Sequence, residues 1–370
     1  MAQTDRKQNK REQKMIPLLE PEIPQKSKEY VMDCLDTGWL SYTGPYVQRF
    51  EDAVKCYINS NAAVAMSNGT GALWLALKAL GVGPGDYVAV PTMTFIATVN
   101  AIIYAGAIPV FIDCNYNLQM DTYYLLSAKQ RYNLKAVIPV HMLGNPCDIE
   151  TIDEITDSNI FLIEDAAQAL GSTYLNSEWK IGTWSDAAMF SFSFNKTVAA
   201  GQGGMVTTNN KTLGDKLKYL SLQAKDDAEM YIHNEAGFNM GMSNINAALA
   251  CGQIENIKAI TTKKKYIKDT YLKLLGKDNL YYQKEGNGWL NAYRSKKTYK
   301  EMSYLLKQKE IQTRPLFYPN HLQKSFRKYP YFGKDTAIQK YEHTVCVPSS
   351  ASITDEQIEF VVKSIKECDN

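Results

Sequence analysis

The residue of this sequence best suited to covalent chemistry is Lys196. It follows an aromatic, apolar run that begins at Phe190, and the glycine-rich stretch 201–204 comes shortly after it. Apolar neighbours disfavour the ammonium form of a lysine and lower its pKa. The neutral amine is a nucleophile that can form a Schiff base with an aldehyde. The alternative is a lysine at a strand end whose charge reaches water, and this stretch alone favours neither interpretation.

Three further features lie upstream of Lys196, each where a predicted strand ends. In residues 67–71, small side chains let backbone N–H groups and the Thr70 hydroxyl approach an anion at a helix N-terminus. Phe95 could stack on an aromatic ring. Asp165 follows the apolar run 160–163, where a carboxylate needs a cationic partner such as a protonated pyridine nitrogen. Taken singly, each has an ordinary explanation: a helix cap, a core phenylalanine and an N-cap aspartate.

Apolar runs alternating with helical stretches indicate the elements that position these residues. Strands are expected at 62–66, 87–90, 107–112, 136–140, 160–163, 187–192 and 204–208, with helices at 71–80 and 97–105 between them. This pattern predicts an α/β fold whose mostly parallel, seven-stranded sheet is covered on both faces. Ligands of such sheets bind at the carboxyl ends of the strands, which is where all four features lie.

The chain divides into three parts in this interpretation. Residues 1–15 form a disordered basic tail, residues 16–250 a large domain with two N-terminal helices (25–36 and 45–57), and residues 251–370 a smaller α+β domain. The smaller domain is expected to contain a long basic helix at 254–275. It is also expected to contain strands at 280–283, 289–293 and 313–317, and helices at 299–309 and 355–368.

Composition excludes several classes of function. The net charge of +2 gives no reason to expect a nucleic-acid or anionic-membrane partner, and no apolar run approaches the length of a membrane span. The seven cysteines are scattered and never paired as Cys-x-x-Cys, which fits reduced thiols in the cytoplasm. With four histidines and no His-x-x-x-His motif, no metal site is expected.

The order and spacing of these motifs resemble the DegT/DnrJ/EryC1/StrS family of sugar aminotransferases, which use pyridoxal phosphate (PLP) and have fold-type I. The matching segments are 37–39, 67–70, 91–95, 139–141, 164–168, 190–192 with Lys196 and 203–204, 237–239, 243–244 and 313–316. Within the family, residues 223–227 and 312–316 look most like the legionaminic-acid-pathway and perosamine-synthase branch.

The resemblance implies a role for each matching residue. Lys196 would hold PLP as a Schiff base and then move protons, while Asp165 would keep the pyridine nitrogen protonated. The remaining implied cofactor contacts are Gln168 near the ring oxygen O3′, Phe95 on the ring, Gly69, Thr70 and Ser191 at the phosphate, and Asn239 at the phosphate of the other subunit's cofactor. Lys225 and His321 are weaker candidates for substrate contacts, since a loop lysine or histidine is more often only solvated.

The resemblance also implies a reaction and a homodimer with shared active sites. An amino group would pass from L-glutamate to C4 of a nucleotide-linked 4-keto-6-deoxy sugar, for bacterial surface-glycan synthesis. Amination at C3 is one alternative, and a PLP-binding regulator or scaffold without turnover is another. Two departures from the family pattern bear on the choice: Gln202 replaces a common glutamate, and Gly241 replaces an arginine.

Overall fold

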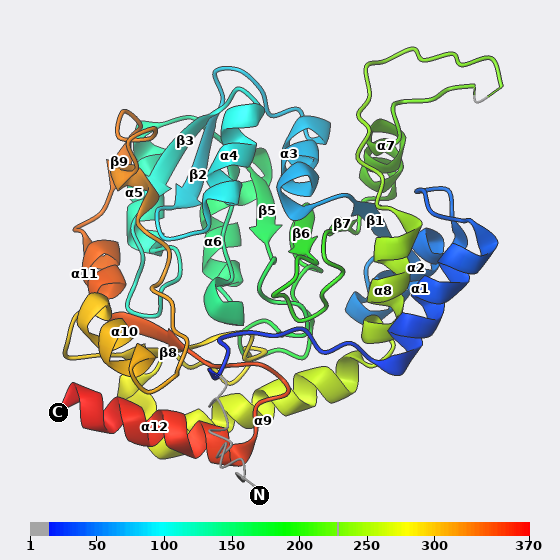
Figure 1. The fold of residues 1–370 in the computed structure, drawn as a ribbon. Coiled ribbons are helices and arrows are strands. Elements are labelled where there is room, and N and C mark those ends of the chain that lie inside the picture. The colour runs from blue at the N-terminus through cyan, green and yellow to red at the C-terminus, as the bar shows by residue number, and fades with distance from the viewer. Residues whose placement is uncertain (1–14, 228) are drawn as a thin grey trace, which may run out of the picture.

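The computed structural model describes residues 15–227 and 229–370, so the predicted basic tail lies outside the described residues except for Met15. An eight-stranded sheet in the order β1-β7-β6-β5-β4-β2-β3-β9 forms the centre of the molecule (Figure 1). The strands are β1 (Ala62–Met66), β2 (Tyr87–Pro91), β3 (Ile108–Ile112), β4 (Leu134–Val137), β5 (Phe161–Asp165), β6 (Ala187–Ser191), β7 (Gly204–Thr208) and β9 (Tyr331–Phe332).

The sheet is mostly parallel, as predicted. β7 is antiparallel to both of its neighbours, β1 and β6, whereas β5, β4, β2 and β3 follow β6 in parallel. All seven predicted strands are present, but the predicted number is one too low because β9 extends the edge beside β3. β9 has two residues, too few to show the periodicity by which a strand is recognised in a sequence.

Helices cover both faces of the sheet because alternate strand residues are apolar on both sides. One core joins Val64, Val88 and Ile163 to α3 (Gly69–Ala79), α4 (Ile96–Tyr104) and α7 (Lys211–Ser221). The opposite core joins Ala65 and Leu162 to four further helices. They are α2 (Pro45–Ile58), α5 (Thr122–Arg131), α6 (Ile149–Thr156) and α8 (Asn244–Ile254). The N-terminal helix α1 (Gln25–Thr37) packs along α8 at one side of the molecule (Figure 1).

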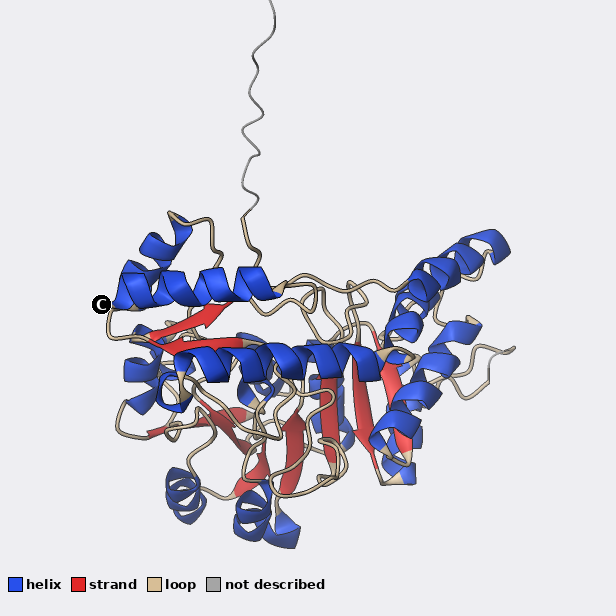
Figure 2. Ribbon diagram, turned by 90° about the horizontal axis from the view of Figure 1, so that it is seen from below, coloured by secondary structure: helices blue, strands red, loops and turns tan. Residues whose placement is uncertain are grey.

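Most of the C-terminal part of the chain packs below the sheet in the view of Figure 1, while β9 and α11 (Thr336–Glu342) lie at its side. The other helices of this part are α9 (Ile257–Leu275), α10 (Tyr299–Lys307) and α12 (Asp355–Asp369). The two long helices α9 and α12 lie side by side (Figure 2). Short 3₁₀ segments occupy Met142–Gly144, Asp157–Asn159, Lys277–Asn279 and Asn320–Leu322.

A second, two-stranded sheet pairs β8 (Asn291–Arg294) with β10 (Thr344–Val347) in antiparallel register. The strand predicted at 289–293 therefore exists, whereas those at 280–283 and 313–317 are wrong, since each makes only a single bridge. Their backbone partners are Tyr293 on β8 and Cys346 on β10, and local sequence patterns do not reveal such tertiary pairings. Among the described residues, no helix combines the length and apolar character that crossing a membrane requires.

This topology brings several chain segments to one edge of the large sheet. Since β1 and β6 both run antiparallel to β7, the carboxyl ends of β1, β2, β4, β5 and β6 meet there together with the amino end of β7. The motifs predicted to do chemistry follow those strand ends.

Candidate active site

A cavity of about 440 Å³ lies at this edge of the sheet. Its wall brings together seven residues that the sequence predicted as cofactor contacts, from four separate segments: Gly69, Thr70, Phe95, Asp165, Gln168, Ser191 and Lys196. Segments from the C-terminal part complete the wall with Trp289 and Arg314. The remaining predicted cofactor contact, Asn239, is exposed and does not line this cavity.

An anion cradle forms where β1 leads into α3. The first N–H groups of a helix have no acceptor within the helix. Asn68 Oδ1 accepts the N–H of Gly71 at 2.8 Å, which leaves those of Gly69 and Thr70 for a ligand. A Cβ on Gly69 would lie 3.1 Å from the Cβ of Ser191, so glycine brings this backbone close to the Ser191 hydroxyl. Together with the helix dipole, these donors suit a phosphate group.

Asp165 ends β5 and faces α4. Its Oδ2 accepts a hydrogen bond of 2.6 Å from the Thr98 hydroxyl, and its Oδ1 accepts the Ala167 N–H at 3.1 Å. Burial raises the pKa of Asp165, although these two hydrogen bonds and the positive charge of Lys196 oppose the rise. A cation placed against this carboxylate inside the cavity would stabilise its ionised form.

Lys196 lies in the turn between β6 and β7 and is half-buried. Its Nζ is 4.4 Å from the centroid of the Trp289 ring. Burial lowers its pKa to about 8, while the negative charge of Asp165 acts in the opposite direction. Near neutral pH, Lys196 therefore has a larger reactive, unprotonated fraction than an ordinary lysine.

Gln168 and Phe95 present a polar and an aromatic group to the same cavity. Gln168 Oε1 accepts the Leu143 N–H at 2.8 Å, which fixes the orientation of the amide. Its Nε2 has the Met142 sulfur at 3.9 Å as its protein partner, so a strong donor remains for a ligand oxygen. The Phe95 ring is 55% exposed and lies 5.6 Å from the Phe317 ring, centroid to centroid.

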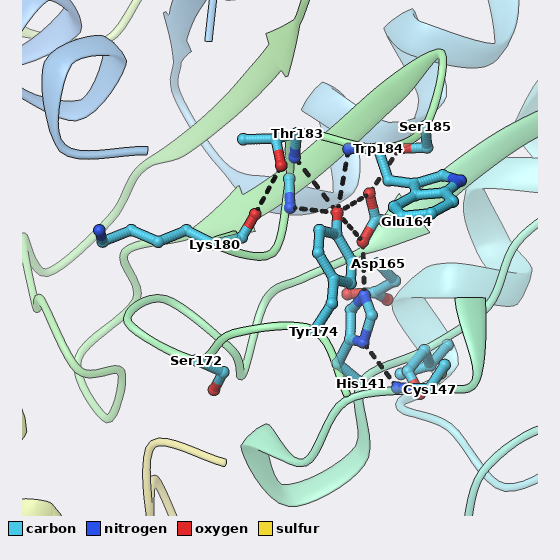
Figure 3. A network of polar contacts seen from close by, with 12 residues as sticks. His141, Cys147, Glu164, Asp165, Ser172, Tyr174, Lys180, Thr183, Trp184 and Ser185 are labelled. Carbon is cyan, nitrogen blue, oxygen red and sulfur yellow. Dashed lines mark hydrogen bonds and ion pairs between the residues drawn. The ribbon is translucent and has the colours of Figure 1, made fainter. Parts of the chain in front are cut away.

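A buried network behind Asp165 is centred on Glu164 (Figure 3). The fully buried Glu164 carboxylate accepts hydrogen bonds from His141 Nε2 at 2.7 Å, the Tyr174 hydroxyl at 2.8 Å and the Ser185 hydroxyl at 2.6 Å. Burial acts to raise the pKa of Glu164, but these donors overcome it and the pKa is lowered. Sequence reasoning did not single out Glu164. The sequence feature that could have identified it is its place beside Asp165, as a second carboxylate at the end of an apolar strand.

His141 links this network to the neighbouring strand end. Its Nδ1 accepts the Cys147 N–H at 3.0 Å, which leaves Nε2 as the ring nitrogen that donates to Glu164. The His141 backbone N–H donates to the Asp165 carbonyl at 3.2 Å. These contacts give His141 a structural role, and the network holds the backbone at Asp165.

Two predicted substrate residues are not brought to the cavity of their own chain. Lys225 is exposed in a loop outside it. His321 stacks on Tyr331 with ring centroids 3.9 Å apart, and its Nδ1 is 2.7 Å from the Thr92 hydroxyl. These contacts give His321 a packing role. Its contact with a substrate, like that of Lys225, stays a prediction, and so does the contact of Asn239 with the cofactor phosphate of the other subunit.

The two departures from the family pattern occupy different environments. Gln202 is exposed and lines the cavity, so it replaces a charge at the site itself. Gly241 is closely packed: a Cβ there would meet Tyr42 Cβ at 2.7 Å and Leu222 Cδ2 at 2.9 Å. A longer side chain at 241 therefore requires Tyr42 to move.

Comparison with known proteins places this geometry in a family. Residues 21–366 match the DegT/DnrJ/EryC1/StrS aminotransferase family. This chain belongs to that family. The resemblance first seen in the motifs thus extends over nearly the whole sequence, and the protein is an aminotransferase.

Relatives and solved structures agree with this assignment. The chain is 37% identical over 366 residues to GDP-perosamine synthase of Escherichia coli O157:H7, covering 96% of this chain and 98% of the relative. It is 31% identical over 363 residues to a putative pyridoxal phosphate-dependent aminotransferase, EpsN, of Bacillus subtilis, covering 93% of each. The fold matches the PLP form of the putative sugar aminotransferase Spr1654 from Streptococcus pneumoniae at a TM-score of 0.89, with 24% identity, covering 96% of this chain and 98% of that one.

The cavity suits PLP in size and in chemistry. The cofactor has an anionic phosphate, an aromatic ring, a ring nitrogen that can carry a proton and an aldehyde. The wall offers the helix N-terminus at Gly69 for the phosphate, Phe95 for the ring and Asp165 for the nitrogen. Lys196 in the same wall suits the aldehyde. These four groups lie on four different segments of the chain.

The pKa of Lys196 is expected to control its reactivity. In the full-length, cofactor-free protein, acylation of Lys196 should rise with pH through about 8, because only the neutral amine reacts. Asp165→Asn removes a negative charge that favours the ammonium, so the midpoint should move to lower pH. Acylation followed by peptide mass spectrometry measures both curves, with the exposed Lys211 reporting the reagent's own pH dependence. A midpoint near 10.5, or one unchanged in Asp165→Asn, would contradict this assignment.

Glu164→Gln should destabilise the fold by about 2–4 kcal/mol. The amide replaces one acceptor oxygen with an N–H₂ group, so at least one of the donors from Tyr174, Ser185 and His141 meets another donor in a buried site. Urea unfolding measures the change, and Glu178→Gln, at an exposed position, is the matched control. Equal unfolding free energies for the two variants would show that the network contributes nothing.

Proposed function

We propose that this aminotransferase transfers an amino group from L-glutamate to C4 of a nucleotide-linked 4-keto-6-deoxy sugar, for synthesis of bacterial surface glycans. The observation that carries the proposal is the convergence of Lys196, Asp165 and the α3 anion cradle on one cavity. The substrate class is inferred from the GDP-perosamine synthases of Escherichia coli O157:H7 and Vibrio cholerae, to which the chain is 37% and 34% identical.

PLP, the cofactor, supplies an electron sink when bound, and the chain's residues act around it. The first N–H groups of α3 and the Ser191 hydroxyl bind the phosphate, and Phe95 holds the ring. Asp165 keeps a proton on the ring nitrogen by supplying a buried negative charge. Lys196 Nζ would hold the cofactor at its aldehyde and would move a proton at the carbon that gains or loses the amino group.

Two substrates must enter in turn, and the wall is mixed enough to accept both. Leu316, Phe317 and Phe194 contribute apolar surface, while Arg314 and Gln202 contribute polar groups. Within the described part of the chain, no salt bridge involves the Arg314 guanidinium. It is therefore available for a carboxylate or a diphosphate, groups that the donor and the nucleotide sugar carry.

We also propose a homodimer in the cytoplasm. Asn239 is exposed and lies in a stretch that flanks the β1–α3 turn, since the Ser67 N–H donates to the Met240 carbonyl at 2.7 Å. From there Asn239 would reach the phosphate site of a partner subunit. All seven cysteines are free thiols, as a reducing compartment leaves them.

The proposal is tested first by the cofactor and then by the product. Purified protein should show the absorption band of lysine-linked cofactor, Lys196→Ala should lose it, and the exposed-lysine control Lys211→Ala should keep it. With L-glutamate and a panel of UDP-, GDP- and dTDP-linked keto sugars, product NMR should show a new amine at C4.

Other outcomes select the alternatives. An amine at C3 would replace the proposed regiochemistry, and a cofactor band that glutamate fails to change would indicate a binding protein without turnover. A wild-type protein that takes up no PLP would overturn the proposal.

A further inference from the structure

The segment 283–289 is anchored to α9 by a buried lysine. Lys268 is 4% exposed. Its Nζ donates to the carbonyls of Gln283 at 2.9 Å and Lys284 at 3.2 Å, and also to that of Gly286. None of the salt bridges among the described residues includes Lys268. Its ammonium is therefore held by backbone carbonyls, and its position fixes the path of the segment.

A second lysine, one turn earlier on α9, reaches the end of the same segment. Lys264 Nζ donates to the Ser349 carbonyl at 2.9 Å and contacts the Trp289 carbonyl at 3.4 Å. Gly288, which precedes Trp289 in this segment, has a φ of +70°, and a Cβ there would lie 2.8 Å from the Lys264 carbonyl. The segment therefore packs directly on the helix backbone, and glycine is required at this point.

Asn287 fixes the segment to the strand ends of the large sheet. Its Nδ2 donates to the carbonyls of Gln168 at 2.9 Å and Leu170 at 3.0 Å, and its Oδ1 accepts the Trp289 N–H at 2.8 Å. Asn287 thereby connects the loop after β5, which carries Gln168, to Trp289. Trp289 is held on both sides, from α9 and from the sheet.

Trp289 in turn contacts the turn that carries Lys196. Its Nε1–H donates to the Asn195 carbonyl at 2.7 Å, and its ring centroid is 4.4 Å from Lys196 Nζ. Trp289 is 3% exposed. A cation over a tryptophan face is stabilised, and more strongly when both are shielded from water.

We propose that Trp289 is a positioning residue whose ring face holds the Lys196 amino group in the cavity whenever that group is not bonded to the cofactor, and that Lys268 and Lys264 fix the segment carrying the ring. The inference rests on the proposed function, in which Lys196 must leave the cofactor and return to it during each turnover. A flexible four-carbon side chain loses rotamer freedom when it is held. A preformed resting place keeps the amine within reach of its target.

The test changes the electrostatics of the ring face and keeps its shape. The full-length protein is produced with mono- and then tetrafluorinated tryptophan, which weakens the attraction of the ring for a cation. The pH midpoint of Lys196 acylation is measured in the cofactor-free protein. It should fall in steps with fluorination, giving up to roughly tenfold faster labelling at pH 7. The control is the Trp289→Phe variant, in which only the other tryptophans are fluorinated. Its pH midpoint of Lys196 acylation should not change with fluorination.

Further variants test the roles of Trp289 and Lys268 separately. Lys268→Met should weaken the response to fluorination, whereas Lys265→Met, at an exposed position on the same helix, should preserve it. Midpoints that do not move with fluorination would overturn the role of Trp289, and a full response in Lys268→Met would overturn that of the anchor. Added PLP should protect Lys196 from acylation; failure to protect would instead overturn the proposed function.

Discussion

The site depends on one property of a β-strand, that consecutive side chains point to opposite faces. Glu164 and Asp165 are adjacent carboxylates at the end of β5, both buried. On one face, three side-chain donors satisfy Glu164. On the other, Asp165 has one hydroxyl and one backbone N–H, and it faces the cavity that contains Lys196. The Glu164 carboxylate is fully hydrogen-bonded within the protein. The Asp165 carboxylate can still pair with a cation placed in the cavity.

Segments distant in the sequence build the remaining wall because the sheet gathers strand ends at one edge. The turn after β1 offers N–H groups, the turn after β6 offers a lysine, and the segment 283–289 offers an aromatic face. That last segment is held by ammonium groups on α9 rather than by the sheet alone. Lys196 is therefore positioned jointly by the large sheet and the C-terminal part of the chain.

Sequence reasoning succeeded where chemistry follows a local signal. Apolar runs bounded by turns marked the seven longer strands of the large sheet, and the motifs after them named the residues that line the cavity. It failed where an environment is made by distant segments. The helix containing Lys264 and Lys268 was described only as basic, since nothing in its sequence separates these two buried lysines from exposed Lys265 beside them. Trp289, Thr98 and the edge strand β9 likewise acquire their roles only through tertiary contacts.

Among the described residues, three lysines have a pKa that burial lowers to about 8: Lys196, Lys264 and Lys268. Only Lys196 among them lines the cavity, so position and not acidity distinguishes it. Borohydride reduction of the PLP-loaded protein, followed by peptide mass spectrometry, identifies the lysine that holds the cofactor. The modification is predicted on Lys196. Its appearance on Lys264 or Lys268, or on no lysine, would contradict the account.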